Sequence, residues 1–263
     1  MGQKYGQNFL VDNNIAKNIV RSLNLSLSAI DNVLEIGPGK GILTKLVQPR
    51  VKFLTCIDID LQLVDSLKRY FASNNVKNVK IVNEDFLKYK MLEEHSNLKI
   101  ISNLPYNVGT AIVQKVLPLN NWCEAVFMLQ KEVVSRLAAK PGSKDYGYIS
   151  IFASYYTESE ILFDVSPKYF KPKPKVVSSV VKLKNKMYKE PDPLLFEFVK
   201  HAFSMRRKTI LNAIASFKEL DKSKGLEIVD NLKISPLLRP GNLSVSDFLS
   251  LTMEIKKYTI RRV

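Results

Sequence analysis

A strand, a glycine turn and a helix follow one another from the stretch Asn32-Val33-Leu34-Glu35-Ile36-Gly37-Pro38-Gly39-Lys40-Gly41. Its first five residues are mostly apolar and predict a buried strand, and its glycines let the backbone approach a ligand before a helix over residues 42–47. This order is typical of the first crossover in a doubly wound α/β sheet that binds a cofactor. The alternative is a plain tight turn without a ligand.

The spacing of the glycines differs from that of a dinucleotide site. In the dinucleotide fingerprint the third glycine would fall at position 42, but Gly41 comes one residue early and Ile42 takes that place. Glu35 lies two residues before Gly37, where its charge would repel a pyrophosphate but suits a cationic ligand. S-adenosylmethionine carries a sulfonium and an ammonium group and no phosphate, so Glu35, Gly37 and Gly39 indicate this cofactor.

The second predicted strand, residues 53–57, ends in Asp58. An acid at this point of a doubly wound fold can accept hydrogen bonds from both ribose hydroxyls of an adenosine. Asp60 has the alternative role of capping the helix that we expect over residues 61–71.

The third predicted strand, residues 79–83, leads to Asp85 and Phe86. Asp85 can accept a hydrogen bond from the adenine amino group, while Phe86 packs against the ring or offers its backbone N–H. Either acid alone is more often a solvated loop residue. Three turns suited to a cofactor after three successive strands favour a binding site.

The fourth predicted strand, residues 99–102, leads into Asn103-Leu104-Pro105-Tyr106. The Asn103 amide and the Leu104 carbonyl can accept hydrogen bonds from an exocyclic amine, and Tyr106 offers a ring for stacking. The first and fourth strands of a doubly wound sheet are neighbours where ligands bind, so this segment should face the glycine loop across one cleft. The alternative is a strand end followed by an ordinary proline turn.

The remaining patterns predict the other elements of two domains. The loop 6–10 precedes a helix capped by Asp12. Further helices are expected over 110–117 and 133–139, an exposed loop over 140–147, and strands over 125–130, 149–156, 160–165 and 176–183. The C-terminal part is expected to contain helices over 193–204, 206–217, 225–232 and 246–258. We therefore expect a sheet domain that binds the cofactor over residues 1–185 and a small helical domain over residues 186–263.

Basic residues outnumber acidic residues along the whole chain. The 263 residues include 40 Lys and Arg against 25 Asp and Glu, a net charge of +15. Residues 1–185 contain 25 bases and 16 acids, and residues 186–263 contain 15 and 9. An excess in both parts favours a polyanionic partner such as nucleic acid or an anionic membrane surface. A solvated basic surface without a partner is the alternative.

Two segments concentrate this charge. In the first, lysines alternate with prolines after Phe170. Such a segment is extended and basic, so it could follow a phosphate backbone while an aromatic ring stacks on a base. The alternative is a stiff linker. The second is a basic cluster in the C-terminal part that fits phosphate contacts or a solvated helix face. The candidate nucleic-acid-binding residues are Lys171, Lys173, Lys175, Arg206, Arg207 and Lys208.

Cysteine and histidine are rare and scattered. Cys56, Cys123, His95 and His201 do not cluster, which argues against a zinc site, a disulfide scaffold and a Cys/His nucleophile, and we expect no metal. No apolar run reaches the roughly 18 residues of a membrane helix, and the N-terminus lacks a signal-peptide pattern. Gly6 stands where N-myristoylation requires Ser or Thr. These features predict a cytoplasmic protein.

Several motifs occur in a fixed order along the chain. They are Gly6-Gln7-Asn8-Phe9-Leu10, Glu35-Ile36-Gly37-Pro38-Gly39, Asn103-Leu104-Pro105-Tyr106-Asn107, Phe127-Met128-Leu129-Gln130-Lys131-Glu132-Val133 and Phe170-x-Pro172-x-Pro174-Lys175-Val176. Together they resemble the KsgA/RsmA family of small-subunit ribosomal RNA adenine dimethyltransferases. Residues 206–209 and 239–244 resemble the C-terminal domain of that family, so the resemblance covers nearly the whole chain.

The resemblance implies a Rossmann-like class I methyltransferase that acts in small ribosomal subunit biogenesis. Its implied reaction is dimethylation, at N6, of two adjacent adenines in a loop near the 3′ end of 16S rRNA. The residues implied to contact S-adenosylmethionine are Asn8, Leu10, Gly37, Asp58, Asp85 and Asn103. The chain departs from the family pattern at Asp58, where Glu is commoner, at Val177, where Asp is frequent, and at Gly241, where an acid is usual.

The expected chemistry is an SN2 transfer of a sulfonium methyl group to the adenine amine, carried out twice on each base. The Asn103 amide oxygen and the Leu104 carbonyl would stabilise positive charge on the nitrogen, and Tyr106 and Phe170 would clamp the base. The proton can leave to water, so no strong general base is needed. The alternatives are a 23S rRNA adenine-N6 methyltransferase of the macrolide-resistance type and a non-catalytic ribosome assembly factor. We expect a monomer without membrane contact.

Overall fold

The computed structural model describes residues 7–90, 97–186, 190, 192–218 and 220–259. Gly6 and His95, which were named above, lie outside these ranges. The chain divides into two compact units, residues 1–134 with 156–189 and residues 135–155 with 190–263. The predicted boundary between residues 185 and 186 stays a prediction, since compactness does not say which residues bind cofactor or RNA.

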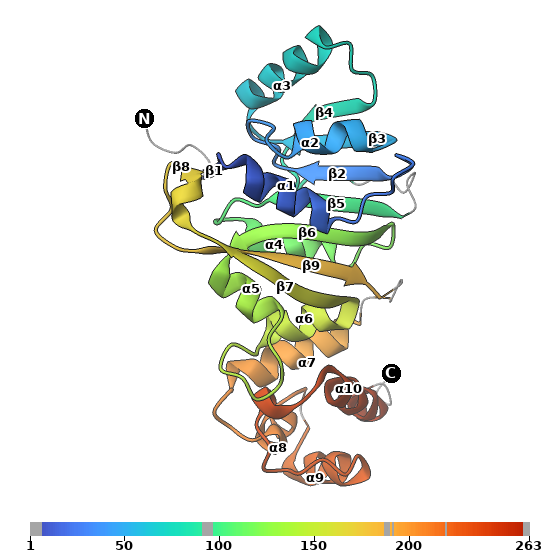
Figure 1. The fold of residues 1–263 in the computed structure, drawn as a ribbon. Helices are drawn as coiled ribbons and strands as arrows, with labels where there is room; N and C mark the ends of the chain where they lie inside the picture. The colour runs from blue at the N-terminus through green and yellow to red at the C-terminus, as the bar shows by residue number, and fades with distance from the viewer. Residues whose placement is uncertain (1–6, 91–96, 187–189, 191, 219, 260–263) are drawn as a thin grey trace. The chain divides into compact units, whose positions relative to one another are not determined.

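A seven-stranded sheet forms the centre of the first unit, in the order β4-β3-β2-β5-β6-β9-β7 (Figure 1). Its strands are β2 (Asn32–Ile36), β3 (Phe53–Asp58), β4 (Val79–Asn83), β5 (Leu98–Asn103), β6 (Trp122–Gln130), β7 (Thr157–Val165) and β9 (Ser178–Asn185). The neighbouring strands β4, β3, β2, β5 and β6 are parallel, and β9 runs antiparallel to β6 and β7. The predicted α/β sheet is confirmed, including the pairing of β2 with β5.

Helices cover both faces of the sheet, which explains why its parallel strands are apolar runs. One face carries α1 (Asn13–Ser22), α2 (Thr44–Val47) with the 3₁₀ turn η1 (Gln48–Arg50), and α3 (Leu61–Ser73). Met128 of β6 belongs to the core cluster on this face. The next residue, Leu129, points to the other face and contacts α4 (Gly109–Val116), where a Cβ on Gly109 would come within 2.5 Å of it.

Two aspartates begin helices of the first unit. Asp12 accepts hydrogen bonds from the backbone N–H groups of Asn14 and Ile15, both at 2.9 Å, as the sequence predicts for the cap of α1. Asp60 accepts from Gln62 N at 3.0 Å and caps α3. Of the two acids at the end of β3, Asp58 and Asp60, it is therefore Asp60 that caps the helix.

A second sheet of two short strands joins distant parts of the chain. The N-terminal strand β1 (Phe9–Leu10) pairs antiparallel with β8 (Phe170–Lys171), which follows the 3₁₀ turn η2 (Pro167–Tyr169). Leu10 is opposite Phe170, and Val11 N donates to Tyr169 O at 2.9 Å. This pairing was not predicted, because two-residue strands have no periodicity to detect.

The second unit contains the helices α6 (Tyr148–Tyr156), α7 (Pro193–Ser204), α8 (Ile210–Ala215), α9 (Lys222–Asn231) and α10 (Val245–Thr259), with a 3₁₀ turn η3 (Pro240–Asn242). The chain enters this unit through α5 (Lys131–Leu137) and leaves it at the end of α6. The predicted C-terminal helices are therefore present, although α8 begins at Ile210 rather than at Arg206.

The predicted strand over residues 149–156 is wrong, because this segment is helix α6. Tyr148, Phe152 and Tyr155 surround Phe196 of α7, with ring centroids 6.4, 4.8 and 5.3 Å away. Positions four and seven residues apart share a helix face, so the aromatic spacing fits a helix although Ile, Phe and Tyr favour strands. A nearly continuous apolar run hides this difference.

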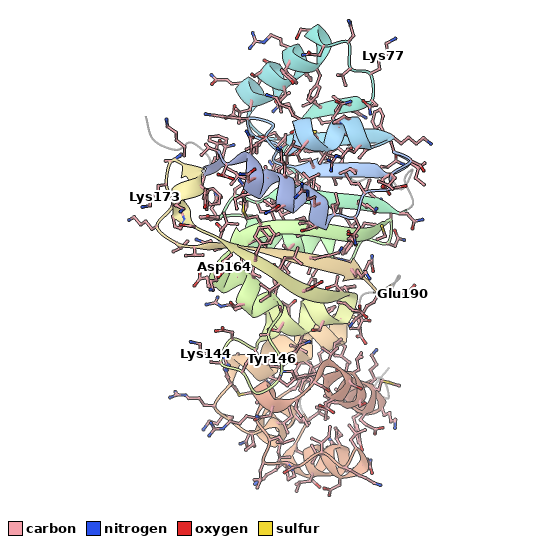
Figure 2. The ribbon with its side chains drawn as sticks, viewed as in Figure 1. Lys77, Lys144, Tyr146, Asp164, Lys173 and Glu190 are labelled. Carbon is pink, nitrogen blue, oxygen red and sulfur yellow. The ribbon has the colours of Figure 1, made fainter. Side chains whose placement is uncertain are left out.

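The loop 140–147 is less exposed than its composition predicts. Tyr146 is buried at 1% exposure and donates a hydrogen bond to Leu243 O at 2.9 Å. Figure 2 labels Tyr146 together with Lys144, which is exposed in the same loop. The prediction that the whole loop is exposed is therefore wrong at Tyr146.

None of the helices in the described ranges is long and apolar enough to cross a membrane. No group of three His, Cys, Asp or Glu side chains in those ranges is arranged to hold a metal ion.

Candidate active site

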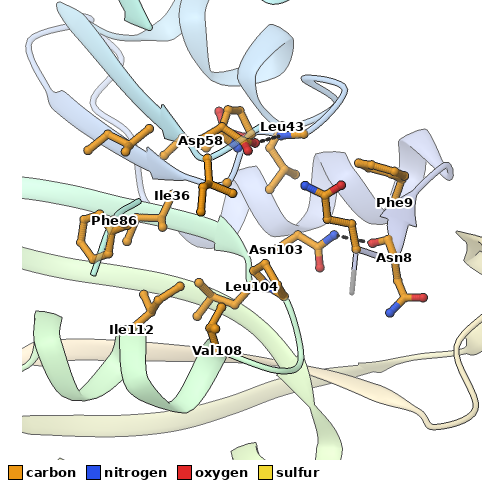
Figure 3. A pocket seen from close by; sticks show the side chains of 18 of the residues that line it. Asn8, Phe9, Ile36, Leu43, Asp58, Phe86, Asn103, Leu104, Val108 and Ile112 are labelled. Carbon is orange, nitrogen blue, oxygen red and sulfur yellow. Dashed lines mark hydrogen bonds between the residues drawn. The ribbon is translucent and has the colours of Figure 1, made fainter. Parts of the chain in front are cut away.

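A pocket lies where the parallel strands end, bounded by the segments after β2, β3, β4 and β5 and by β1 (Figure 3). Parallel strands bring their carboxyl ends to one edge of a sheet, so residues far apart in sequence meet there. Most of the predicted site residues line this pocket: Asn8, Leu10, Glu35, Gly37, Gly39, Asp58, Asp85, Phe86, Asn103, Leu104 and Tyr106. Their individual roles stay predictions.

The glycines after β2 serve different purposes. Gly37 has φ +66° and borders the pocket, and a Cβ built on it meets nothing within 4 Å. Gly41 has φ +79°, but a Cβ there would come within 2.5 Å of Leu67 Cδ2 on α3. Gly37 therefore leaves open space for a ligand, whereas Gly41 permits close packing of the loop against α3.

Gly39 contacts the N-terminal strand. It has φ +57°, and an added Cβ would be 3.1 Å from Cε1 of the Phe9 ring. The Lys40 ammonium lies 4.9 Å from the centre of the same ring. The Phe9 ring thus packs on the glycine loop and helps β1 to form one wall of the pocket.

Glu35 is buried at 1% exposure next to Thr44 and Cys56. Burial raises its pKa from 4.5 to about 7, although Thr44 and the Cys56 thiol, which donates at 3.8 Å, favour the ionised form. Cys56 is buried as well, and its burial together with the neighbouring Glu35 raises the pKa of the thiol well above its usual value. Near neutral pH the carboxyl group at this position is therefore close to half ionised.

Asp58 joins the glycine loop to the start of α3. Its two carboxylate oxygens accept from Gly39 N at 3.0 Å and from Asp60 N at 2.9 Å, and the residue is only 4% exposed. Burial raises the pKa of Asp58, while these two amide hydrogen bonds oppose the shift. A carboxylate has further lone pairs, so a contact with ribose hydroxyls is compatible with this arrangement and stays a prediction.

The turn after β4 is held by a lysine that the sequence analysis missed. Lys115 of α4 donates from Nζ to the carbonyl oxygens of Phe86, Leu87 and Tyr89 at 2.7, 2.8 and 2.6 Å. Burial lowers the pKa of Lys115, and the charge of Asp85 opposes this. Nothing in the local sequence of α4 marks this lysine, because its partners lie 26–29 residues earlier.

The side chain of Asn103 is oriented by the N-terminal segment. Its Nδ2 donates to the backbone carbonyl of Asn8 at 3.1 Å (Figure 3). Only the NH₂ group can donate to a carbonyl, so this bond identifies which end of the amide is the oxygen. The preceding Ser102 donates to the carbonyl of Ile36, which ties the ends of β5 and β2 together.

Tyr106 lines the pocket, and the hydroxyl group of its side chain is held by a hydrogen bond. Its hydroxyl lies 2.5 Å from the Ser178 hydroxyl at the start of β9. Burial raises the pKa of Tyr106 above its usual value, so the phenol is neutral at physiological pH. The ring is thus held by a hydrogen bond that the sequence analysis did not foresee, because the two residues lie 72 positions apart.

The structure does not bring Phe170 into the pocket with the other predicted catalytic residues. Phe170 is 4% exposed and belongs to the core cluster. Lys171, Lys173 and Lys175 follow it and are all exposed, and Figure 2 labels Lys173. The clamping role of Phe170 and the RNA contacts of these lysines stay predictions.

The basic cluster of the second unit occupies a turn between α7 and α8, and not a helix face. Arg206, Arg207 and Lys208 are exposed. Arg206 donates from its guanidinium to Lys144 O at 2.6 Å, so part of its function is to hold the loop before α6. Arg207 and Lys208 are the clearer candidates for phosphate contacts, which stay predictions.

Comparison with known proteins gives a match along almost the entire chain. The family described as "Ribosomal RNA adenine dimethylase" matches residues 1–257. The chain is 39% identical over 267 residues to the "Ribosomal RNA small subunit methyltransferase A" of Alkaliphilus metalliredigens (strain QYMF), covering 95% of this chain and 90% of the relative.

Solved structures show the same fold. A dimethyladenosine transferase from Plasmodium falciparum aligns with a TM-score of 0.82 at 24% identity, covering 95% of this chain and 98% of that one. The 23S rRNA methyltransferase ErmE aligns with a TM-score of 0.72 at 23% identity, covering 95% and 100%. At these identities the similarity concerns the fold and does not choose between RNA substrates.

Proposed function

The chain belongs to the ribosomal RNA adenine dimethylase family, and on that premise we propose that it methylates adenine N6 in small-subunit rRNA with S-adenosylmethionine. The proposed target is the pair of adjacent adenines in the loop near the 3′ end of 16S rRNA, and the modification contributes to small-subunit biogenesis. The observation that carries the proposal is the orientation of the Asn103 amide, whose oxygen is available to accept a hydrogen bond from an amine.

The pocket residues fit S-adenosylmethionine. Gly37 leaves open space where any other residue would place a Cβ, and Glu35 provides a buried acid near the loop. Asp58, Asp85 and Phe86 border the same pocket and would hold the adenosine part, while Asn8 and Leu10 close it from the N-terminal side. When bound, the cofactor supplies an electrophilic methyl group attached to a sulfonium.

The residues after β5 would act on the target base. The adenine amine is a poor nucleophile because its lone pair is delocalised into the ring. The Asn103 oxygen and the Leu104 carbonyl accept its two hydrogens, favour a pyramidal nitrogen and stabilise the positive charge that develops there. Tyr106, anchored through Ser178, offers its ring for stacking and limits the positions that the base can take.

No general base is required in this scheme. The N–H proton becomes acidic only after the nitrogen has been methylated, and it can pass to water. The adenine must leave its stack to reach the pocket, so an unpaired loop nucleotide is the suitable substrate.

The remaining assignments complete the proposal. Residues 1–185 bind the cofactor and carry out the reaction, and residues 186–263 contact the ribosomal subunit. Phe170 clamps the base once RNA is bound, and the phosphate contacts come from the exposed basic residues Lys171, Lys173, Lys175, Arg206, Arg207 and Lys208. The protein acts as a cytoplasmic monomer.

Methyl transfer to isolated ribosomal subunits tests the substrate. With tritiated S-adenosylmethionine, label should enter small subunits that lack the modification, and digestion of their RNA should yield N6-dimethyladenosine by mass spectrometry. Label found only in large subunits would instead assign the protein to the macrolide-resistance type. Calorimetric titration with S-adenosylmethionine separately tests whether the protein is an enzyme. A non-catalytic assembly factor without a cofactor site would not bind the cofactor at millimolar concentration.

A further inference from the structure

A small hollow with a basic rim lies on the α1 side of the sheet, apart from the pocket described above. Its lining consists of Lys17, Val20 and Arg21 from α1, Leu46 from α2 and Arg50 from η1. Val20 is 2% exposed, so its side chain belongs to the core, whereas the three basic residues are exposed. The hollow therefore has an apolar floor and three cations at its edge.

The segments that form this hollow contain no acidic residue. Neither residues 13–30 nor residues 36–57 include Asp or Glu, although they include six Lys and Arg. Within the described part of the chain, Lys17, Arg21 and Arg50 have no ion-pair partner. The positive net charge of the whole chain would not by itself gather three unpaired cations around one hollow.

The positions of these cations are set by well-packed elements. Lys17 and Arg21 lie four residues apart on α1, so they share one face of the helix. Ala16, Ile19 and Val20 anchor the adjoining face of α1 in the core. Like charges at this spacing repel and destabilise a helix slightly, and a bound anion would remove that cost.

Helix α1, which contributes two of the three cations, begins next to the pocket. Helix α1 follows β1 directly, and Phe9 and Leu10 of β1 line the pocket. Lys17 is five residues after the cap Asp12, which corresponds to about 7–8 Å along the helix axis. An RNA strand that delivers an adenine to the pocket can therefore continue over α1.

We propose that the hollow formed by Lys17, Arg21 and Arg50 binds the phosphate backbone of the rRNA substrate. This inference rests on the proposed function, and it adds a contact surface of the first unit beyond the lysines after Phe170. Arginine suits such a site because its guanidinium binds phosphate oxygens through two parallel hydrogen bonds. Contacts to phosphates position the RNA and carry no sequence information.

Charge neutralisation tests the contact. The variant Lys17→Gln/Arg21→Gln/Arg50→Gln should weaken binding to unmodified small subunits by about tenfold or more at low salt. The slope of log affinity against log salt should become shallower by about two to three, as expected for three lost phosphate contacts. The control Lys77→Gln/Lys80→Gln/Lys184→Gln removes the same charge from exposed positions elsewhere in the unit and should keep the wild-type slope.

Each outcome has a defined meaning. Thermal unfolding should show that both variants are folded. Cofactor titration should give the wild-type affinity for both, because none of the six residues lines the pocket. An unchanged salt slope in the first variant, or an equal loss of affinity in the control, overturns this inference. The proposed function is judged separately, because it stands as long as the wild-type protein transfers methyl groups to small subunits. Unchanged RNA affinity with lost binding to phosphatidylglycerol vesicles would also overturn it, because the hollow would then be a lipid-binding site.

Discussion

The side-chain amide of Asn103 donates its hydrogen bond to the backbone carbonyl of Asn8, 95 residues earlier in the chain. Asn103 is the last residue of β5, the strand next to β2. Asn8 directly precedes β1, which pairs with β8. The acceptor oxygen of Asn103 therefore points in a direction that is set by a distant part of the chain.

Replacing Asn103 should separate binding from chemistry. Asn103→Ala removes the oxygen proposed to accept a hydrogen from the adenine amine, so we expect kcat to fall by about 100–1000-fold. Cofactor affinity should stay within roughly tenfold, about 1.4 kcal/mol, as measured by calorimetry. Asn107→Ala, at an exposed position on the same pocket, is the control and should stay active. Substantial activity in Asn103→Ala would refute the assigned role.

The anchor of Tyr106 should affect RNA more than cofactor. Ser178→Ala leaves the Tyr106 hydroxyl without its partner at 2.5 Å, so the ring loses its fixed position. We expect KM for the RNA substrate to rise by about 3–10-fold, in line with the loss of one hydrogen bond, while cofactor affinity is unchanged. Ser179→Ala is the matched control, because the Ser179 hydroxyl donates to Asp164 instead. Equal effects of the two substitutions would argue against the anchor.

The sequence was sufficient to predict the central sheet and most of the pocket lining, for a physical reason. Buried parallel strands are continuous apolar runs, and the residues directly after them meet at one edge, so Asp58, Asp85 and Asn103 could be placed together without coordinates. The contacts that hold them depend on long-range geometry. Neither the donation from Lys115 to the turn after β4 nor the bond between Tyr106 and Ser178 leaves a local pattern.

Glu35 should make stability depend on pH. Its pKa is about 7 in the folded protein and 4.5 in the unfolded chain, so between these values the native state holds a proton that the unfolded state has lost. The free energy of unfolding should therefore decrease as pH rises from 4.5 to about 7, by on the order of 3 kcal/mol from this group.

Glu35→Gln isolates that contribution, because the amide has nearly the same shape and does not titrate. Urea unfolding at a series of pH values should show that the difference between wild type and variant changes across this interval and is constant above pH 8. A difference that does not vary with pH would show that Glu35 titrates normally. Binding of the cationic cofactor should also strengthen as pH rises through 7 in the wild type alone if Glu35 faces the cation.

Lys115 should act as a positioning residue for the cofactor pocket. Lys115→Met keeps the apolar stem but loses three hydrogen bonds to the turn that contains Phe86. We expect the cofactor KM to rise by about tenfold while kcat at saturating cofactor changes little. Lys88→Met, at an exposed position within the same turn, is the control and should keep the wild-type KM. A fall in kcat with an unchanged KM would contradict this role.

The two glycine positions should respond differently to alanine. Gly41→Ala places a methyl group against Leu67 at positive φ, and we expect a loss of about 2–4 kcal/mol in the free energy of unfolding. Gly37→Ala meets no atom and should cost only about 1–2 kcal/mol from its backbone conformation. Because its methyl group would project into open space at the pocket, cofactor titration should reveal the larger loss of affinity in Gly37→Ala. The opposite ranking would mean that Gly37 does not face the ligand.

The pairing of β1 with β8 determines when the pocket can be completed during translation. Phe9 and Leu10 leave the ribosome before their partners Phe170 and Lys171, which are synthesised about 160 residues later. At roughly 5–20 residues per second this interval lasts on the order of 10–30 seconds. A nascent chain therefore passes through a stage in which the parallel strands β2 to β6 can pair while β1, which walls the pocket, still lacks its partner strand. Any factor that binds apolar segments meets Phe9 and Leu10 unpaired at this stage.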